Sequence, residues 1–468
     1  VSKYIDQTEL IVMDQENVGA EVQGELFKRR RSEIPDAERV SILQEKLYQK
    51  ANQERGYVFY VLYDKMFIPY MLREAWKSVK SNDGAPGVDG MTMDKVEEYG
   101  VDVYLKELGE ELRRQTYKPQ AVKRVMIPKA NGGQRPLGIP TVRDRIAQTV
   151  CKMILEPIFE ADFEDSSYGF RPERSSKDAI TAIKEHLKAG KTEVYDADLS
   201  KYFDTIPHDK LQIALKQRIA DPRILKLINK WLKVSVYEDG QYKSGKDNHT
   251  GTPQGGVISP LLANIYLHLV DRIVNNAQSL FSKHGVKMVR YADDFVLMGR
   301  MLPEEVIEKL KNLLHRMGLS LNEGKTRKLD ASRESFNFLG FTIRYDKDIK
   351  GRDFRYWNIV PSKKSEQKIR DKVKEYLGKH GHCRAHDVAD GLNSIMRGWL
   401  NYFSIIGVSY PSMSKRRLRE YLSTSLYRYY NRKSQRKSRL YGHMAFEILT
   451  AKFGLIDPSK YVYPLARL

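Results

Sequence analysis

Several features that would place the chain in a specialised class are scarce or absent in its 468 residues. It has two cysteines, Cys151 and Cys383, which excludes a disulfide-stapled scaffold and suits a reducing compartment. The richest apolar stretch, 257–270, is interrupted by polar residues, so no segment is expected to span a membrane. The first residues carry no apolar signal-peptide core. We therefore expect a globular protein of the cytosol.

What the chain has in excess is positive charge. Lys and Arg number 80 against 60 Asp and Glu, which gives a formal net charge of +20. Residues 361–440 alone hold 19 Lys and Arg against 6 Asp and Glu. Such an excess predicts a polyanionic partner, most commonly nucleic acid. The segment also contains Tyr421, Tyr427, Tyr429 and Tyr430. Interleaved rings and cations suit a groove for phosphates and bases, but a solvated helix face stays open as the alternative.

The hydrophobic pattern predicts a mixture of helices and strands. Apolar spacing and capping signals predict helices that begin near Pro35, Asp144, Ser259 and Pro303. β-rich runs predict strands at 123–128, 193–199, 287–298 and 336–344. Because these elements do not alternate in regular βαβ units, we expect an α+β fold. After residue 357 the chain becomes helical and basic, apart from a Gly- and His-rich interruption near Gly381.

Two short acidic segments indicate where the chemistry lies. Asp293 and Asp294 lie in an apolar, β-prone run, where adjacent carboxylates are costly to bury without a charge partner. A tight hairpin turn is one explanation, and a divalent metal held by carboxylate oxygens is the other. In the strand predicted before them, alternation places Val194, Asp196 and Asp198 on one face. If Asp198 meets Asp293 and Asp294, three carboxylates can hold two Mg²⁺ ions roughly 3.5–4 Å apart for nucleotidyl transfer.

A second group of metal-ligating residue types lies in the C-terminal part: His380, His382, Cys383 and His386. A structural zinc site usually has two well-spaced ligand pairs, and the other cysteine is remote in the sequence. An RNA-contacting loop or a linker is therefore favoured.

From about residue 57 to the C-terminus, a series of motifs resembles bacterial group II intron-type reverse transcriptases. In chain order they are NDGAPGVDG (82–90), IPK (127–129), GQRPLGIP (133–140), YGFRP (168–172), DLSKYFD (198–204), GTPQGG (251–256), YADD (291–294), LNEGKT (321–326), FLGF (338–341) and GWLNYF (398–403). A lone acidic tetrapeptide would be weak evidence, whereas this many motifs in family order are specific.

The resemblance implies an α+β right-hand polymerase with fingers, palm and a helical, basic thumb that corresponds to the maturase region. Residues 1–55 match no motif and are expected to form a helical N-terminal extension without an assigned role. The implied divisions are fingers with the N-terminal extension loop (56–192), palm with the acids (193–358), thumb (359–440) and C-terminal tail (441–468).

The resemblance also implies roles in catalysis. Asp198, Asp293 and Asp294 would be the catalytic and metal-binding acids, with the backbone carbonyl of Leu199 as a further ligand. Two Mg²⁺ ions, replaceable by Mn²⁺, would be the cofactors. Phe203 would select dNTPs by blocking a ribose 2′-OH, although an ordinary core phenylalanine is the alternative.

Further residues are implied to bind the substrates. Lys129 and Arg135 flank a Gly-rich turn and would offer two cations to the dNTP triphosphate. Gln254 would pack on the incoming nucleotide, and Lys325 would face pyrophosphate or pair with a nearby acid. The implied nucleic-acid contacts are Arg171, Tyr291, Ala292, Arg416, Arg417, Arg419, Arg432 and Lys433.

The implied activity is RNA-directed DNA polymerisation, in which dNTPs extend a DNA primer on an RNA template. The protein would also assist the splicing and mobility of a group II intron RNA. Two alternatives stay open: a free-standing host enzyme in DNA repair or phage defence, and an RNA-binding splicing cofactor that does not polymerise. No Cys/His-rich nuclease module is evident, so target-strand cleavage is not expected of this chain. The expected location is the bacterial cytosol or nucleoid, and the oligomeric state is open.

Overall fold

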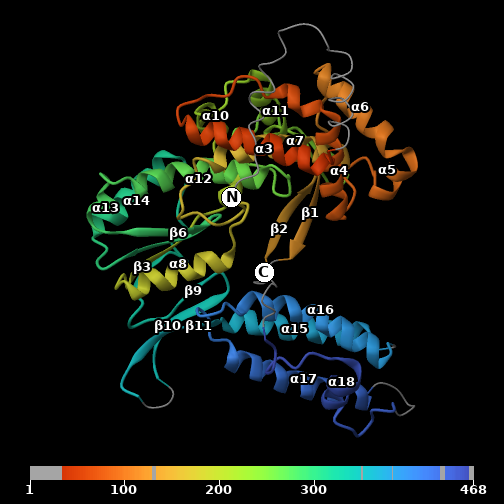
Figure 1. Ribbon diagram of the computed structural model, residues 1–468, viewed down its shortest axis with the longest axis vertical. Coiled ribbons are helices and arrows are strands. Elements are labelled where there is room, and N and C mark those ends of the chain that lie inside the picture. Colours follow the sequence, from red (N-terminus) through yellow and green to blue (C-terminus); the bar gives the residue numbers. More distant parts are fainter. Residues whose placement is uncertain (1–33, 129–132, 349–351, 382, 433–437, 463–468) are drawn as a thin grey trace, which may run out of the picture. The chain divides into compact units, whose positions relative to one another are not determined.

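The computed structural model describes residues 34–128, 133–348, 352–381, 383–432 and 438–462. The chain divides into two compact units that alternate along the sequence (Figure 1). Unit 1 runs to Asp162 and resumes over His208–Leu262, whereas unit 2 comprises Phe163–Pro207 and the chain from Ala263 onward. No helix within the described ranges is long and apolar enough to cross a bilayer. Helices and sheets occur in both units, which confirms the α+β class.

Unit 1 is mainly helical and is organised around one long buried helix, α7 (Val142–Glu160). This helix begins after Thr141, whose hydroxyl accepts a hydrogen bond from the Asp144 backbone N–H at 3.2 Å. Cys151 on the same helix is completely buried. The other helices are α3 (Asp36–Gln53), α4 (Pro69–Ser81), α5 (Met93–Tyr99), α6 (Val101–Arg113), α10 (His208–Lys216) and α11 (Pro222–Leu232). The predicted helices near Pro35 and Asp144 are therefore confirmed as α3 and α7.

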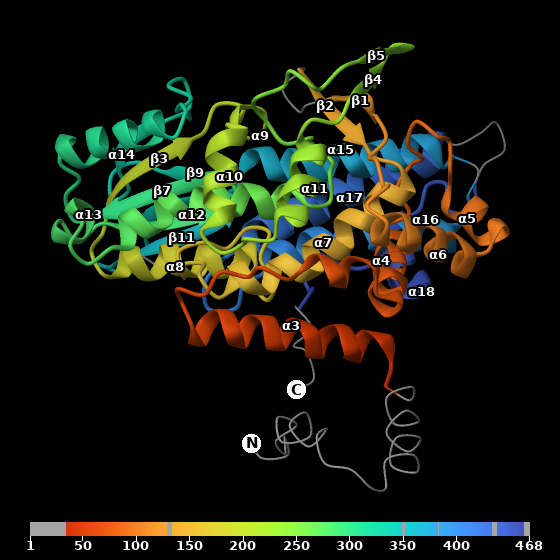
Figure 2. The same cartoon turned by 90° about the horizontal axis from the view of Figure 1, so that it is seen from above.

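A four-stranded sheet projects from these helices in the order β2-β1-β4-β5 (Figure 2). Its strands are β1 (Val122–Pro128), β2 (Gln134–Ile139), β4 (Val236–Glu238) and β5 (Gln241–Lys243). β1 and β2 form an antiparallel hairpin, whereas β1 and β4 are parallel. The predicted strand at 123–128 is confirmed as β1.

Unit 2 contains an antiparallel sheet in the order β6-β7-β3-β8. Its strands are β3 (Glu193–Asp198), β6 (Lys287–Tyr291), β7 (Asp294–Gly299) and β8 (Arg327–Asp330). The predicted run at 287–298 is thus a hairpin of two strands. A second sheet has the order β11-β10-β9 and consists of β9 (Phe336–Phe338), β10 (Phe341–Lys347) and β11 (Arg355–Pro361).

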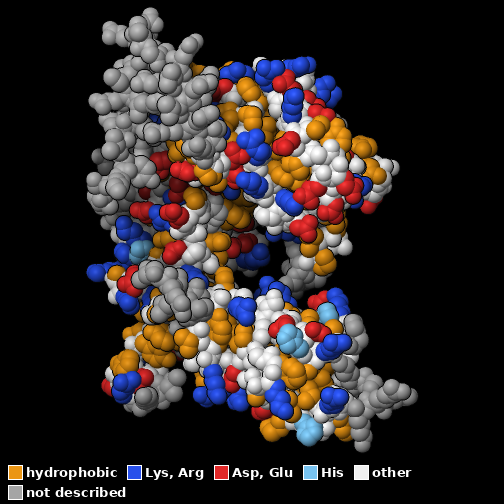
Figure 3. Space-filling model, turned by 45° about the vertical axis from the view of Figure 1, so that its right-hand side comes forward, with side chains coloured by type: hydrophobic (Ala, Val, Ile, Leu, Met, Phe, Trp, Pro, Cys, Tyr) orange, Lys and Arg blue, Asp and Glu red, His pale blue; other side chains and the backbone are white. Residues whose placement is uncertain are grey.

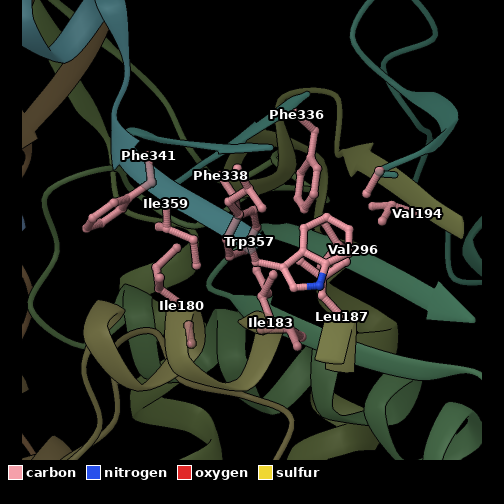
Figure 4. Packing of buried hydrophobic residues seen from close by; sticks show 14 of the residues in the cluster. Ile180, Ile183, Leu187, Val194, Val296, Phe336, Phe338, Phe341, Trp357 and Ile359 are labelled. Carbon is pink, nitrogen blue, oxygen red and sulfur yellow. The ribbon is translucent and has the colours of Figure 1, made fainter. Parts of the chain in front are cut away.

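One hydrophobic core joins both of these sheets to helix α8 (Ser176–Lys188). The helix contributes Ile180, Ile183 and Leu187, which lie close to side chains of the strands (Figure 4). Members of this core from the strands include Val194, Val296, Phe336, Phe338, Phe341, Trp357 and Ile359. The acidic ends of β3 and β7 are therefore anchored to a well-packed body.

The remaining α-helices lie in unit 2, apart from the first residues of α12. α12 (Ser259–Asn275) and α14 (Glu304–Arg316) begin where the sequence predicts, and two short helices are α9 (Tyr202–Thr205) and α13 (Leu280–Lys283). The C-terminal part is formed by α15 (Lys363–Lys379), α16 (Ala385–Phe403), α17 (Ser412–Arg432) and α18 (Ala445–Phe453). These four helices share a hydrophobic core of their own. The predicted break near Gly381 is confirmed, because it separates α15 from α16.

Candidate active site

The strand register of unit 2 brings two of the predicted acids together. In the β3–β7 pair, Asp198 lies directly opposite Asp294. Asp293 lies in the turn between β6 and β7, next to Ala292, which has a left-handed φ of 58°. Like charges directly opposite on neighbouring strands destabilise a sheet unless a cation balances them. The register therefore leaves negative charge at the end of these strands that a nearby cation would stabilise.

A lysine balances part of this negative charge. The Nζ of Lys325 lies 3.1 Å from Oδ2 of Asp198, which is the ion pair predicted as one of its two roles. The lysine is held near β3 because the backbone N–H of Asn322 donates to the Asp198 carbonyl at 2.7 Å. Leu199, the next residue, forms an antiparallel bridge with Leu321. The Lys325 side chain is 66% exposed and is thus free to move away from the acid.

The carboxyl pKa values also show that negative charge is crowded at this end of the sheet. Part of Asp294 reaches solvent, yet local desolvation, assisted by the charges of Asp293, Asp198 and Asp196, raises its pKa to about 7. Burial raises the pKa of Asp196 to about 6, against the opposing effect of Arg327. Both carboxyl groups would release their protons more readily beside a bound cation.

Hard carboxylate oxygens are suitable ligands for Mg²⁺ or Mn²⁺, so the donor chemistry of Asp198, Asp293 and Asp294 fits a divalent ion. Among the described side chains, no three His, Cys, Asp or Glu already converge into a metal-binding group. The carboxylate of Asp198 is paired with Lys325 instead. An ion that binds Asp198 would compete with this pair.

Phe203 lies on the short helix α9, directly after β3. The preceding Lys201 has a left-handed φ of 48°, which turns the chain sharply after the strand. Tyr202 is buried, and its hydroxyl donates to the carbonyl of Ala263 at 2.6 Å. The Phe203 ring contacts the Tyr202 ring edge-on, with 5.5 Å between centroids, and remains half-buried. It is therefore not fully buried in the core, and its ring borders solvent near the acidic strand.

Two of the residues predicted to bind dNTPs meet in unit 1. Nε of Arg135, on β2, donates to Oε1 of Gln254 at 2.9 Å. The Gly138 backbone N–H donates to the Gln254 carbonyl at 2.6 Å. Gly255 has a φ of 104°, and a Cβ there would lie 2.1 Å from the Gly138 carbonyl oxygen. Lys129, the other predicted cation of this hairpin, lies outside the described residues.

Arg171 is predicted to contact the template, but its side chain is only 8% exposed. Its Nη1 donates to the carbonyls of Glu164 and Ser167 at 2.6 and 2.8 Å. Its guanidinium also lies over the Phe163 ring, 5.2 Å from the centroid. Nη1 therefore holds the loop that contains Glu164 and Ser167, and a contact of Arg171 with template stays a prediction.

The loop at 82–90 is held by a residue that the sequence did not single out. Arg145 on α7 donates from Nε to the Pro140 carbonyl at 3.0 Å and from Nη1 to the Gly84 carbonyl at 3.0 Å. Its Nη2 donates to the carbonyl of Ala85. Gly87 approaches so closely that a Cβ there would lie 2.7 Å from the Thr141 Cα. Arg145 lies on the opposite side of this helix from the apolar positions Ile146, Val150 and Ile154, so the sequence pattern carried no signal for its burial.

The arginines predicted to bind nucleic acid on α17 differ in their surroundings. Arg416 is exposed and forms no ion pair within the described ranges. Arg417 pairs with Glu366 at 3.4 Å, and Arg419 pairs with Asp457 at 3.3 Å. Arg432 ends the helix, and Lys433 lies outside the described residues. In the lower part of Figure 3, Lys and Arg side chains are interspersed with hydrophobic ones.

Most of the four tyrosines of this segment are packed, which contradicts the interpretation that these rings, interleaved with cations, line a groove for phosphates and bases. Only Tyr427 among the four is exposed. Tyr430 is buried, and the hydroxyls of Tyr421 and Tyr429 donate to the carbonyls of Arg370 and His380 at 3.2 and 2.6 Å. Amphipathic packing of α17 is the reason, because these rings belong to the core of the C-terminal helices or pack against it.

Comparison with known proteins agrees with the chemistry of these residues. Residues 127–343 match the family model described as reverse transcriptase (RNA-dependent DNA polymerase). Residues 366–445 match the model described as the group II intron, maturase-specific domain. The first match runs from the last two residues of β1 into β10, and the second runs from within α15 to the first residue of α18. Reverse transcriptases generally use divalent metal ions, in keeping with the carboxylates on β3 and β7.

Curated relatives extend the match. Protein YkfC of Escherichia coli (strain K12) is 37% identical over 333 residues, covering 64% of this chain and 86% of the relative. The group II intron-encoded protein LtrA of Lactococcus lactis is 30% identical over 361 residues, covering 64% and 59%. An uncharacterised 91 kDa protein in a cob intron of Schizosaccharomyces pombe is 27% identical over 435 residues, covering 77% and 53%. This chain thus spans little more than half the length of LtrA and of the Schizosaccharomyces pombe protein. It belongs to the group II intron-type reverse transcriptases, with an RNA-directed DNA polymerase domain followed by a maturase-specific domain.

Proposed function

We propose that this protein copies RNA into DNA by extending a primer 3′-OH with dNTPs, and that it assists the splicing and mobility of a group II intron RNA. The observation that carries the proposal is the register that sets Asp198 opposite Asp294, with Asp293 in the adjoining turn. The bacterial cytosol or nucleoid, where RNA and dNTPs are available, is the proposed place of action.

We further propose a right-hand arrangement for the polymerase. Residues 56–192 would act as fingers, 193–358 as palm and 359–440 as thumb, with 1–55 and 441–468 as extensions. The location of the acids on a packed antiparallel sheet supports the palm, and the Lys- and Arg-rich helices α15 and α17 support the thumb.

In catalysis, the carboxylates of Asp198, Asp293 and Asp294 and the backbone carbonyl of Leu199 would hold two Mg²⁺ ions, with Mn²⁺ as a substitute. When bound, such ions supply Lewis-acid chemistry that activates the primer hydroxyl and stabilises the leaving pyrophosphate. Lys325 would release Asp198 and offer its ammonium to the pyrophosphate. The 66% exposure of its side chain supports this movement.

The dNTP would be recognised by residues from several elements. Arg135, oriented by Gln254, would bind the triphosphate together with Lys129. Phe203 would press its ring against C2′ and so disfavour rNTPs, because a 2′-OH has no room there. The position of this half-buried ring just after β3, the strand that carries Asp198, supports this role.

Nucleic acid would be bound largely through phosphates and shape. Arg416, Arg417 and Arg419 on α17, with Arg432 and Lys433, would contact primer–template or intron RNA. Tyr291 and Ala292 would border the primer end beside the acids. Binding that depends on such phosphate contacts becomes weaker as the salt concentration rises.

Primer extension on poly(rA)/oligo(dT) with Mg²⁺ tests the polymerase. Asp293→Ala should abolish dNTP incorporation while RNA binding remains, because it removes a metal ligand and leaves the basic surface intact. Asp353→Ala, which removes an exposed acid of the same unit, is the matched control and should polymerise normally. Undiminished synthesis by Asp293→Ala would contradict the assignment. A wild-type protein that promotes intron splicing without extending primers would identify the non-polymerising cofactor instead.

A further inference from the structure

A completely buried arginine lies directly beside the turn between β6 and β7, which contains Ala292 and Asp293 and is called the acidic turn below. Arg290, on β6, has no exposed side-chain surface. Its Nε and Nη2 donate to the two carboxylate oxygens of Asp271 at 2.8 and 2.5 Å. Its Nη1 donates to Oδ1 of Asn264 and to the carbonyl of Ala292, both at 2.9 Å. One guanidinium therefore connects the buried core to the backbone of the turn.

The partners of Arg290 are themselves fixed. Asn264 and Asp271 are seven residues apart on α12, which places them on one face, two turns apart. Nδ2 of Asn264 donates to the Gly169 carbonyl at 2.7 Å. A Cβ on Gly169 would lie only 2.3 Å from the Ala292 backbone nitrogen. The turn is thus enclosed by α12, by the loop that contains Gly169 and by Arg290.

The turn needs such support because of its backbone conformation. Ala292 has a φ of 58°, a left-handed conformation that residues with a Cβ rarely adopt unless the surroundings enforce it. The contact at its carbonyl comes from Arg290. Asp293 and Asp294 follow immediately, so a rotation at Ala292 would redirect both carboxylates.

We infer that Arg290, locked by Asp271 and Asn264, is a positioning residue that holds the left-handed turn at Ala292 and thereby aims Asp293 and Asp294 for metal binding and nucleotidyl transfer. This inference rests on the proposed polymerase function. It goes beyond that function because the three side chains are buried and would act on the reaction only through the turn. A shift of about 1 Å in catalytic groups can lower turnover about 100-fold.

The opposing explanation is an ordinary buried ion pair that only stabilises the fold. The two explanations differ in what an apolar replacement does. A buried ion pair can often be exchanged for apolar residues of similar volume without loss of stability. Positioning, in contrast, requires a hydrogen-bond donor at the Ala292 carbonyl, which no apolar side chain supplies.

The test is the double variant Arg290→Met/Asp271→Leu, compared with Arg73→Met/Asp36→Leu. The control removes another Arg–Asp pair with two hydrogen bonds, at 2.6 and 3.0 Å, in unit 1. We expect both doubles to unfold cooperatively and to bind primer–template with unchanged Kd. Only in the double variant Arg290→Met/Asp271→Leu should kcat fall about 100-fold. This variant should also bind Mn²⁺ about tenfold more weakly, measured by electron paramagnetic resonance without substrate.

Arg290→Lys keeps the test decisive if the double variant does not fold. A lysine retains the charge beside Asp271, but one ammonium cannot reproduce the planar fork that reaches Asp271, Asn264 and the Ala292 carbonyl together. We expect kcat to fall about tenfold with unchanged primer–template Kd. Normal kcat and Mn²⁺ binding in a folded Arg290 variant would overturn the inference. A wild-type protein that fails to polymerise would instead overturn the proposed function, while the Mn²⁺ measurement would still test the positioning role.

Discussion

Arg290 in unit 2 and Arg145 in unit 1 are both buried and both hold a backbone turn, but their charges are balanced differently. Arg290 is paired with the carboxylate of Asp271. Arg145 donates to the carbonyls of Pro140, Gly84 and Ala85 and forms no ion pair within the described part of the chain. Burial accordingly lowers the pKa of Arg145.

The difference indicates how each turn responds to change. Removing Arg290 leaves a carboxylate buried without a cation, whereas removing Arg145 leaves only neutral carbonyls that water can satisfy. The acidic turn is therefore coupled to global stability. The loop at 82–90 is coupled mainly to its own local order.

The largest effect should come from removing each guanidinium alone. We expect Arg290→Met to lower the free energy of unfolding by about 3–5 kcal/mol, because Asp271 stays buried and unpaired. Arg145→Met should lower it by about 1–2 kcal/mol. Urea denaturation of both variants measures the two values. Equal losses would show that the carbonyl-held arginine is as essential to the fold as the ion-paired one.

A loss of stability smaller than that of Arg290→Met is expected when the loop at 82–90 is disturbed by volume alone. Gly87→Ala would place a Cβ 2.7 Å from the Thr141 Cα, so the loop must shift, at about 1–3 kcal/mol. Gly56→Ala is the matched control, because no atom lies within 4 Å of a Cβ at that position. Thermal unfolding compares the two. A stable Gly87→Ala protein would mean that Arg145 holds the loop without the close backbone contact.

The acidic turn should in addition respond to pH. Since the pKa of Asp294 is about 7 without metal, protons compete with the ion below pH 7, and Mn²⁺ affinity should fall by up to about tenfold per pH unit. In the metal-free protein the raised pKa favours folding at low pH, and this contribution is lost as pH rises to about 7.

Mn²⁺ titrations between pH 6 and 8 measure this dependence, and Asp294→Asn should flatten it. Asp196, with a pKa of about 6, titrates in an overlapping range, so Asp196→Asn serves as the comparison. If only Asp196→Asn flattens the profile, the proton that competes with the ion belongs to Asp196.

The smallest effects are expected for the arginines of α17. Here the comparison is between two arginines near the surface that differ in whether an acid of the protein pairs with them. Arg416 is exposed, whereas Arg419 pairs with Asp457 and lies 5.5 Å over the Phe446 ring. Arg416→Ala should reduce the slope of log affinity against log salt by about 1 and leave stability unchanged. Arg419→Ala should lower stability and leave the slope nearly unchanged. Filter binding at several salt concentrations measures the slopes, and the reverse pattern would assign phosphate binding to Arg419.

Local signals in the sequence predicted much of the fold. Proline and first-turn signals located the start of α3, α12 and α14, and β-rich runs located β1 and β3. The acidic motifs identified Asp198, Asp293 and Asp294 as candidates. Each of these signals depends on neighbours within a few residues, so a single sequence is sufficient to read it.

Pairing between distant segments was not predictable in the same way. The position of Asp198 opposite Asp294 depends on the β3–β7 register, and the Arg290–Asp271 pair depends on how α12 packs against β6. The sequence offered two signals for this pair: a lone arginine in an apolar strand, and the seven-residue spacing of Asn264 and Asp271. Likewise, composition could not distinguish the buried Tyr430 from the exposed Tyr427 on one helix.

The complete burial of Cys151 in α7 has a practical consequence. Burial raises the pKa of its thiol, so the reactive thiolate form is suppressed and reagents cannot reach the sulfur. Cys383 is half-exposed just before α16. A maleimide fluorophore would therefore attach at a single native position, and its emission would report movements of the C-terminal helices during RNA binding without any engineered cysteine.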